Sequence, residues 1–236
     1  MKQILGTLLA MVLAAVPLHA QPSDNPVEQR YGASAYPWSD EIAWDNVVNI
    51  LDHGGVADGV TPNDAAFVSA RDAAAAAGGG IVYFPTGTYF FADSIGLKDG
   101  VVLRGDSPVV ADAGDPSFRP PSRLVFPKFV FDPAANGGNG TDPDTAFKFI
   151  GKVEGEAGKN TGMVHLDINR ASIWAGGGGT GSGNVILMGL RSNNVASPQP
   201  WTVPTSDQNP WQMHPNRFTD NISAFGYENV LVANNR

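Results

Sequence analysis

The chain has 236 residues, of which 28 are Gly, 18 are Pro and none is Cys, and its formal net charge is −8. This composition excludes a coiled coil, a disulfide framework and any site built on a thiolate. The acidic balance also argues against nucleic acid or an anionic membrane as the partner. Because 42% of the residues are hydrophobic, the chain can bury a core. So many Gly and Pro residues then favour an all-β protein with many short strands and turns.

Residues 1–20 have the pattern of a secretory signal peptide. Lys2 precedes an uncharged apolar run from Ile4 to Val16, and a small-residue cleavage site ends at Ala20. The run is shorter than the roughly 20 residues of a membrane-spanning helix. We therefore expect cleavage after Ala20, no membrane span, and a secreted or periplasmic location. The alternative is a buried N-terminal helix.

Residues 21–41 are polar and rich in proline, and we expect them to form a lead-in segment before a domain over 42–236. The apolar stretch from Ile42 to Leu51 fits a short helix or a strand. The next pattern predicts a helix with Thr61 as N-cap and Pro62 at its first position. Its apolar stripe follows helical spacing and ends at three consecutive glycines: Ala66, Phe67, Ala70, Ala73, Ala74, Ala77, then 78–80.

Only short apolar strands separated by turns follow this helix. The predicted strands are 81–84, 88–91, 95–97, 101–103, 124–126, 146–150, 163–168, 185–190 and 230–232. Met163 and Val185 are 22 residues apart, and Val185 and Val230 are 45 apart. A period of 20-odd residues is typical of stacked β-helix coils. We also expect the asparagines at 193–194 and 234–235 to stack between coils.

The stretch from 54 to 106 contains a characteristic set of motifs: Asp58-Gly59-Val60-Thr61, the run 78–84, Pro85, Gly87, Tyr89 and Leu103-Arg104-Gly105. With these motifs it resembles the pectate-lyase-like right-handed parallel β-helix superfamily, and more narrowly its rhamnogalacturonase/epimerase-like pectate lyase domain. The sequence departs from the family pattern at Ala57 and at Pro62-Asn63. This motif specifies a fold more strongly than a reaction, because lyases, hydrolases, epimerases and viral tailspikes share it.

The resemblance implies a right-handed parallel β-helix whose first coil is capped by the alanine-rich helix. A solenoid has open edges at its ends, and an amphipathic helix suits the covering of one of them. Five or six coils fit the length, and no pattern of a C-terminal cap precedes Arg236. We therefore expect this chain to be truncated, with residues 42–236 forming the N-terminal part of the domain.

A proline-rich segment over about 195–220 predicts a long loop beside the solenoid. Aromatic faces stack well on sugar rings, so Trp201 and Trp211 are candidates for substrate binding. The alternative is that the two tryptophans only fix the loop onto the solenoid.

The segment 164–170 alternates apolar and polar residues, as a strand with one solvent face does. This pattern places His165, Asp167 and Asn169 on one face, with Arg170 at the strand end. An imidazole, a carboxylate and a guanidinium together suit acid/base work on a uronate, so Asp167, His165 and Arg170 are weak catalytic candidates. A solvated strand face without function is the alternative, and no second carboxylate for glycoside hydrolysis is evident.

The sequence requires no cofactor and predicts no metal site. Oxygen ligands at Asn136, Asn139, Asp142 and Asp144 are compatible with Ca²⁺, although their spacing does not match an EF-hand loop.

We therefore expect an exported carbohydrate-active protein that acts on a polysaccharide, as a polysaccharide lyase or a glycoside hydrolase. The lyase reaction is β-elimination, in which a base removes the proton beside a uronate carboxylate. The alternative is a non-catalytic cell-surface β-helix that serves as an adhesin or a glycan-binding scaffold. The choice between lyase, hydrolase and epimerase, the identity of the polysaccharide and the oligomeric state stay open.

Overall fold

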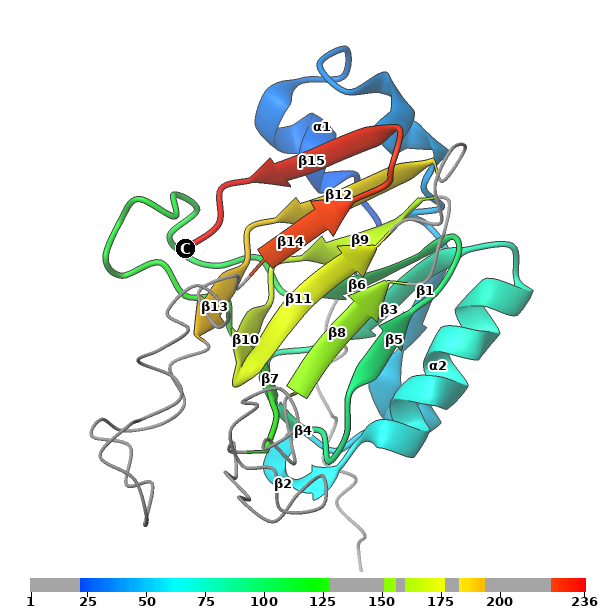
Figure 1. Ribbon diagram of the computed structural model, residues 1–236, viewed down its shortest axis with the longest axis vertical. Helices are drawn as coiled ribbons and strands as arrows, with labels where there is room; N and C mark the ends of the chain where they lie inside the picture. Colours follow the sequence, from blue (N-terminus) through cyan, green and yellow to red (C-terminus); the bar gives the residue numbers. More distant parts are fainter. Residues whose placement is uncertain (1–21, 128–150, 156–159, 177–182, 194–221) are drawn as a thin grey trace, which may run out of the picture.

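The computed structural model describes residues 22–127, 151–155, 160–176, 183–193 and 222–236. Within them, short parallel strands form three sheets that the chain visits in turn, A then B then C (Figure 1). We call one such passage a coil. Each strand pairs in parallel with the equivalent strands of the neighbouring coils. The protein is thus mostly β, with parallel sheets and few helices, consistent with a parallel β-helix.

Sheet A contains β1 (Val47–Asn49), β3 (Gly80–Phe84), β6 (Val101–Gly105), β9 (Thr161–Val164), β12 (Asn184–Met188) and β15 (Asn229–Ala233). Sheet B contains β2 (Asp58–Pro62), β4 (Gly87–Phe90), β7 (Ser122–Val125), β10 (Asp167–Asn169) and β13 (Arg191–Asn193). Sheet C contains β5 (Ile95–Leu97), β8 (Gly151–Gly155), β11 (Ala171–Gly176) and β14 (Ile222–Phe225). The helices are α1 (Pro26–Tyr31), α2 (Asp64–Ala76) and the 3-10 turns η1 (Pro37–Glu41) and η2 (Ile50–His53).

The interior of the coils is a continuous apolar core. Strand register stacks equivalent inward positions of sheet A on one another, and one such column is fully buried: Val82, Leu103, Met163 and Leu187. Because each side chain is covered by those of the adjacent coils, the core grows by repetition.

The predicted period of 20-odd residues is confirmed, with a correction of register. Partners in sheet A are 21 residues apart between Ile81 and Val102, and 24 apart between Gly162 and Ile186. Val185 pairs with Thr161 and not with Met163. Val185 does pair with Val230, so the interval of 45 residues is one coil with a long insertion between β13 and β14.

Helix α2 begins two residues later than predicted, at Asp64 and not at Pro62. Asn63 is the cap residue, and Thr61 and Pro62 belong to β2. The reason is local: the Asp58 carboxylate accepts hydrogen bonds from the backbone N–H and the hydroxyl of Thr61, at 2.8 and 2.7 Å. These bonds hold Thr61 in the strand before the helix.

Residues 22–44, predicted as a polar lead-in as far as 41, pack against the outer face of sheet A (Figure 1). Val27, Ile42 and Trp44 are buried there against side chains of five of its strands: Ile81, Tyr83, Val102, Val164, Ile186, Met188 and Leu231. Arg104 lies beneath this cover with 1% of its side chain exposed. Its guanidinium carbon is 5.7 Å from the Trp44 ring centroid, and its Nη2 is 3.1 Å from the Asp24 carboxylate.

In the described residues, asparagine side chains stack between coils at positions that were not predicted. Asn229 donates to Asn184 at 2.7 Å, and Asn184 donates to Asn160 at 2.6 Å. Asn234 and Asn235 instead bind backbone groups, and the side chain of Asn193 and all of Asn194 lie outside the described structure. The ladder stands where the chain enters sheet A, because Asn184 and Asn229 each begin a strand there.

We expect Gly162→Ala to lower the free energy of unfolding by about 3 kcal/mol or more. A Cβ at this position would lie 2.0 Å from the carbonyl oxygen of Ile186 in the next coil, so the coils could not approach each other. Urea unfolding measures the effect.

Gly54→Ala is the matched control, since Gly54 also has a positive φ, of 87°, but a Cβ there meets nothing within 4 Å. It should cost about 1 kcal/mol, the backbone contribution alone. Equal losses in the two variants would contradict the idea that coil contact restricts Gly162.

Candidate functional site

The alternation predicted over 164–170 holds only within β10, because His165 forms a corner before this strand, with a φ of 55°. The strand is not solvated either. Ile168 of β10 points into the core, whereas Asp167 and Asn169 occupy the alternate positions. Asp167 is only 1% exposed and Asn169 only 7%. The expectation of a solvated face is therefore wrong for these two side chains, because the neighbouring coils cover them.

Asp167 lies between two arginines in a column across three coils of sheet B. Register pairs it with Arg123 on one side and with Arg191 on the other. Nη1 of Arg191 is 3.1 and 3.2 Å from the two carboxylate oxygens, and Nε of Arg123 is 3.9 Å from one of them. The arginine side chains are 42% and 22% exposed, for Arg123 and Arg191. We call these three residues the arginine column.

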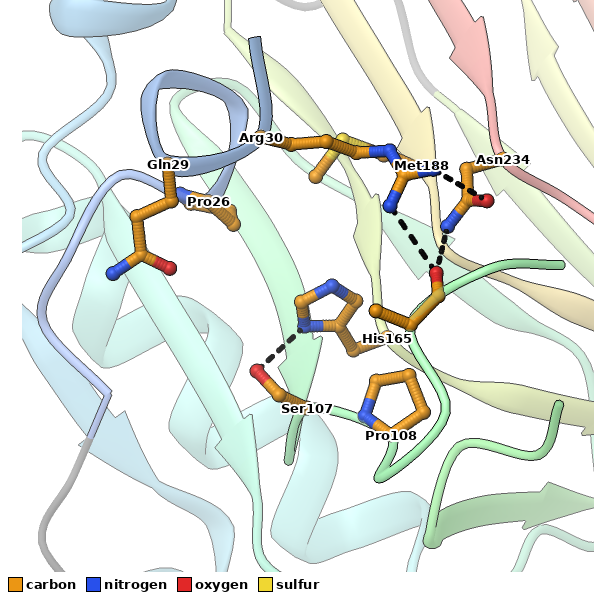
Figure 2. A pocket seen from close by; sticks show the side chains of 9 residues that line it. Pro26, Gln29, Arg30, Ser107, Pro108, His165, Met188 and Asn234 are labelled. Atoms are coloured by element: carbon orange, nitrogen blue, oxygen red, sulfur yellow. Dashed lines mark hydrogen bonds between the residues drawn. The ribbon is translucent and has the colours of Figure 1, made fainter. Parts of the chain in front are cut away.

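His165 lies elsewhere, at the corner between sheets A and B, and lines a pocket of about 320 Å³ (Figure 2). We call this space the corner pocket. Its walls come from α1, from the loop that follows β6, and from the ends of β12 and β15. Neither Asp167 nor Arg170 is among its lining residues. The structure therefore separates the candidates that the sequence placed on one face.

The His165 ring is fixed in place and uncharged at neutral pH. Its Nδ1 is 3.2 Å from the Ser107 hydroxyl, and its backbone N–H donates to the carbonyl of Met188. The residue has a positive φ of 55°, which forms the tight corner. Burial, reinforced by the charges of Arg104 and Arg30 and opposed by Asp24, lowers the pKa of His165 from 6.5 to about 4.

Arg170 forms the next corner, between β10 and β11, with a φ of 66°. Its Nη1 donates to the carbonyl of Phe126 at 3.2 Å. This hydrogen bond joins neighbouring coils, so the structure shows Arg170 in a contact between coils.

Other predicted positions lie outside the described residues. They are the signal-peptide segment, the substrate-binding candidates Trp201 and Trp211, and the oxygen ligands Asn136, Asn139, Asp142 and Asp144. In the described ranges, no group of three or more His, Asp or Glu side chains could hold a metal ion. No helix in those ranges is long and apolar enough to cross a membrane.

Arg123, Arg191, Arg30 and Ser107 were not singled out from the sequence. One signal was available for Arg191, which follows Asp167 by 24 residues, the local length of a coil. Arg123 is separated from Asp167 by a long insertion, and Arg30 reaches the corner pocket from a segment that precedes the first coil. For Arg123 and Arg30, therefore, no periodicity in the sequence indicates these positions.

We expect Asp167→Asn to lower the free energy of unfolding by about 1–3 kcal/mol. Two neighbouring guanidiniums would lose their shared counter-charge, and their partial exposure keeps the loss moderate. Chemical denaturation measures the effect, with the exposed Asp45 changed to Asn as the control. A double-mutant cycle with Arg191→Gln should give a favourable coupling energy; additive losses would contradict the ion pair.

We expect the pKa of His165 to make stability depend on pH between about 4 and 6.5. In this window the unfolded chain binds a proton at His165 and the folded chain does not. The contribution is therefore complete above about pH 6.5 and is lost as the pH falls toward 4. His165→Gln should flatten this part of the stability profile, measured by denaturation at a series of pH values. His53→Gln serves as the control, and an unchanged slope in the His165 variant would contradict the assignment.

Comparisons with known proteins find one family model and several relatives. Residues 47–119 match the family model described as rhamnogalacturonase A/epimerase, pectate lyase-like. Mannuronan C5-epimerase AlgE4 of Azotobacter vinelandii is 41% identical over 66 residues, which cover 28% of this chain and 12% of that protein. Mannuronan C5-epimerase AlgE1 of the same organism is 43% identical over 67 residues, covering 25% and 5%. The matches thus span only a small part of these relatives.

Among solved structures, the A-module of AlgE4 is similar with a TM-score of 0.39 and 22% identity, covering 62% of this chain and 38% of that one. The family 28 exopolygalacturonase of Yersinia enterocolitica has a TM-score of 0.31 and 15% identity, covering 61% and 38%. The resemblance predicted from residues 54–106 is confirmed by the sequence match over 47–119, which is to the rhamnogalacturonase A/epimerase, pectate-lyase-like family.

Proposed function

We propose that this chain is an exported, carbohydrate-active enzyme that acts on an acidic polysaccharide. The match to the pectate-lyase-like family and the similarity to mannuronan C5-epimerases both support a sugar polymer as the substrate. The signal-peptide pattern of residues 1–20 supports export. The lyase or hydrolase reaction predicted from the sequence remains part of the proposal, beside epimerisation.

The observation that carries the acidic substrate is the arginine column. It brings two guanidiniums to one carboxylate, and so leaves a local excess of positive charge in a chain whose net charge is −8. Strands in a sheet are about 4.8 Å apart, so Arg123 and Arg191 stand about 10 Å from each other along the solenoid. This distance is on the scale of a disaccharide, which lets the column contact successive uronates of one polymer.

Arginine suits this role because its planar fork matches a carboxylate. Pairing with a guanidinium neutralises the uronate carboxylate and stabilises the negative charge that develops when the adjacent carbon loses its proton. Loss of that proton is the first step of both β-elimination and C5 epimerisation. Hydrolysis instead needs two carboxyl groups across the glycosidic bond.

Within this proposal, Asp167 acts through its arginines. Its carboxylate is buried and holds Arg191 by two short contacts, so it orients the guanidinium that meets the substrate. His165 and Arg170 remain catalytic candidates in this proposal, and they lie at the two corners that border β10. Trp201 and Trp211 remain the proposed stacking residues for sugar rings.

We also infer that α2 caps the solenoid. The helix contacts η2, β1 and β3, which belong to the first two coils. Its buried face, including Phe67 and Ala70, joins the interior core. The inward side chains at this end of the described coils thereby gain an apolar partner.

Incubation with pectin, rhamnogalacturonan and alginate tests the proposed reaction. Absorbance of unsaturated uronides indicates a lyase, and new reducing ends without it indicate a hydrolase. Uptake of solvent deuterium without cleavage indicates an epimerase. Binding without any of these reactions would favour the alternative of a glycan-binding or adhesin scaffold.

For the arginine column, we expect Arg123→Gln to weaken binding of the preferred polyuronate about tenfold, because one charge-assisted contact is lost. Lys98→Gln, which removes a half-exposed cation from the corner between β5 and β6, is the matched control and should bind like the unaltered protein. Affinity electrophoresis or calorimetry measures the difference. Full affinity in the Arg123 variant, or equally tight binding of a neutral glucan, would overturn the proposal.

A further inference from the structure

The corner pocket lies apart from the arginine column, and five segments that are distant in the sequence build it. Arg30 comes from α1, Ser107 from the loop after β6, His165 from the corner after β9, Met188 from the end of β12, and Asn234 from the end of β15. Its volume of about 320 Å³ lies at the lower end of the range for small-molecule sites. The pocket therefore suits one compact ligand better than an extended polymer.

A network of hydrogen bonds holds the rim of the pocket in place (Figure 2). Arg30 donates from Nη1 to the carbonyl of Ala111 at 3.2 Å and from Nη2 to the Asn234 side chain at 3.0 Å. Asn234 in turn donates to the carbonyl of Ala111 at 2.7 Å and accepts from the backbone N–H of Ala113 at 2.9 Å. Because the rim is already ordered, a ligand does not have to order it on binding.

The groups that remain available are mostly hydrogen-bond donors. Arg30 has five N–H donors, and the hydrogen bonds above use two of them. The ring nitrogen of His165 that does not meet Ser107 lies on the side of the ring toward Arg30 (Figure 2). Gln29 adds an amide at the rim, and the buried Met188 gives an apolar wall.

The pocket is also electropositive. Its described lining contains the cation Arg30 and no carboxylate, in a chain that has 23 acidic residues against 15 basic ones, and the His165 ring adds no charge at neutral pH. Arg104 adds to the positive potential at His165, and Asp24, with which Arg104 is paired, opposes it. An anionic group in the pocket would compensate the cations that face His165.

We propose that the corner pocket binds a single hexuronate unit, either a free sugar acid or the end of a polyuronate chain, at a site separate from the arginine column. Arg30 takes the carboxylate, and His165 with Gln29 and Asn234 takes the ring hydroxyls. The apolar face of the sugar ring lies against Met188. The choice of a sugar acid among small carboxylates rests on the proposed function, whereas the choice of an anion rests on the lining of the pocket alone.

Titration of the protein with galacturonate, glucuronate and mannuronate tests this site, followed by NMR signals of the His165 ring and by calorimetry. His165→Gln identifies those signals among the four histidines of the chain. At least one hexuronate should bind and raise the pKa of His165, because its carboxylate offsets the charge of Arg30. Galactose, the neutral counterpart of galacturonate, should bind about tenfold more weakly or worse.

Arg30→Gln should weaken hexuronate binding about tenfold, and Arg119→Gln, which removes an exposed arginine of the same loop region outside the pocket, should not. Ser107→Ala provides a second variant with little risk to the fold, since Ser107 is exposed, and should weaken binding about threefold through loss of the contact with His165. Thermal unfolding of each variant verifies that α1 remains in place.

A parallel titration with oligouronates distinguishes a free sugar acid from the end of a polyuronate chain as the ligand. A shift of the His165 signals by oligouronates supports a chain end, and a shift by the monosaccharide alone supports a free sugar acid. Equal binding of galactose, full affinity in Arg30→Gln, or phosphate binding as tightly as every hexuronate would overturn the proposal. Arg123→Gln should leave the corner pocket unaffected, so this site and the proposed action on polysaccharides can fail independently.

Discussion

In-register stacking of successive coils is the constraint on which the rest of this structure depends. Parallel pairing in sheet A places equivalent positions of neighbouring coils directly on one another, from β1 to β15. In the interior, this stacking produces continuous apolar columns. Where the chain enters sheet A, it produces the ladder of Asn160, Asn184 and Asn229. Outside, the same stacking brings Arg123 and Arg191 to either side of Asp167. A shift of one coil by one residue would exchange inward and outward side chains.

Coverage of sheet A by residues 22–44 decides which outer surfaces are available. That segment buries Trp44 and Arg104 against the sheet, so this face cannot serve as an open groove. Sheet B keeps partly exposed arginines, and the corner pocket forms where α1 meets the end of the covered face. The packing of this one segment therefore separates the surface that we propose for a polymer from the pocket that we propose for a single sugar unit.

Much of the fold could be predicted because the relevant signals are local. The strand over 81–84, the alanine-rich helix and the glycine-rich turn between them each follow from neighbouring residues. The start of the helix was predicted wrongly, because the hydrogen bonds of Asp58 to Thr61 compete with capping. The stacked asparagines were missed because Asn184 and Asn229 begin their strands, whereas the predicted asparagines end or follow strands.

The sequence by itself determined the class of fold and the likeness to a family, since periodicity, turn residues and the motif over 54–106 are all properties of short segments. Only the tertiary structure decided the chemistry of the surface. It buried Asp167 between two arginines from other coils and moved His165 into a pocket with Arg30. The physical reason is that the charge around a side chain and its burial depend on residues one or more coils away. Because insertions of variable length separate the strands, the spacing of these neighbours in the sequence is not constant and cannot be predicted from it.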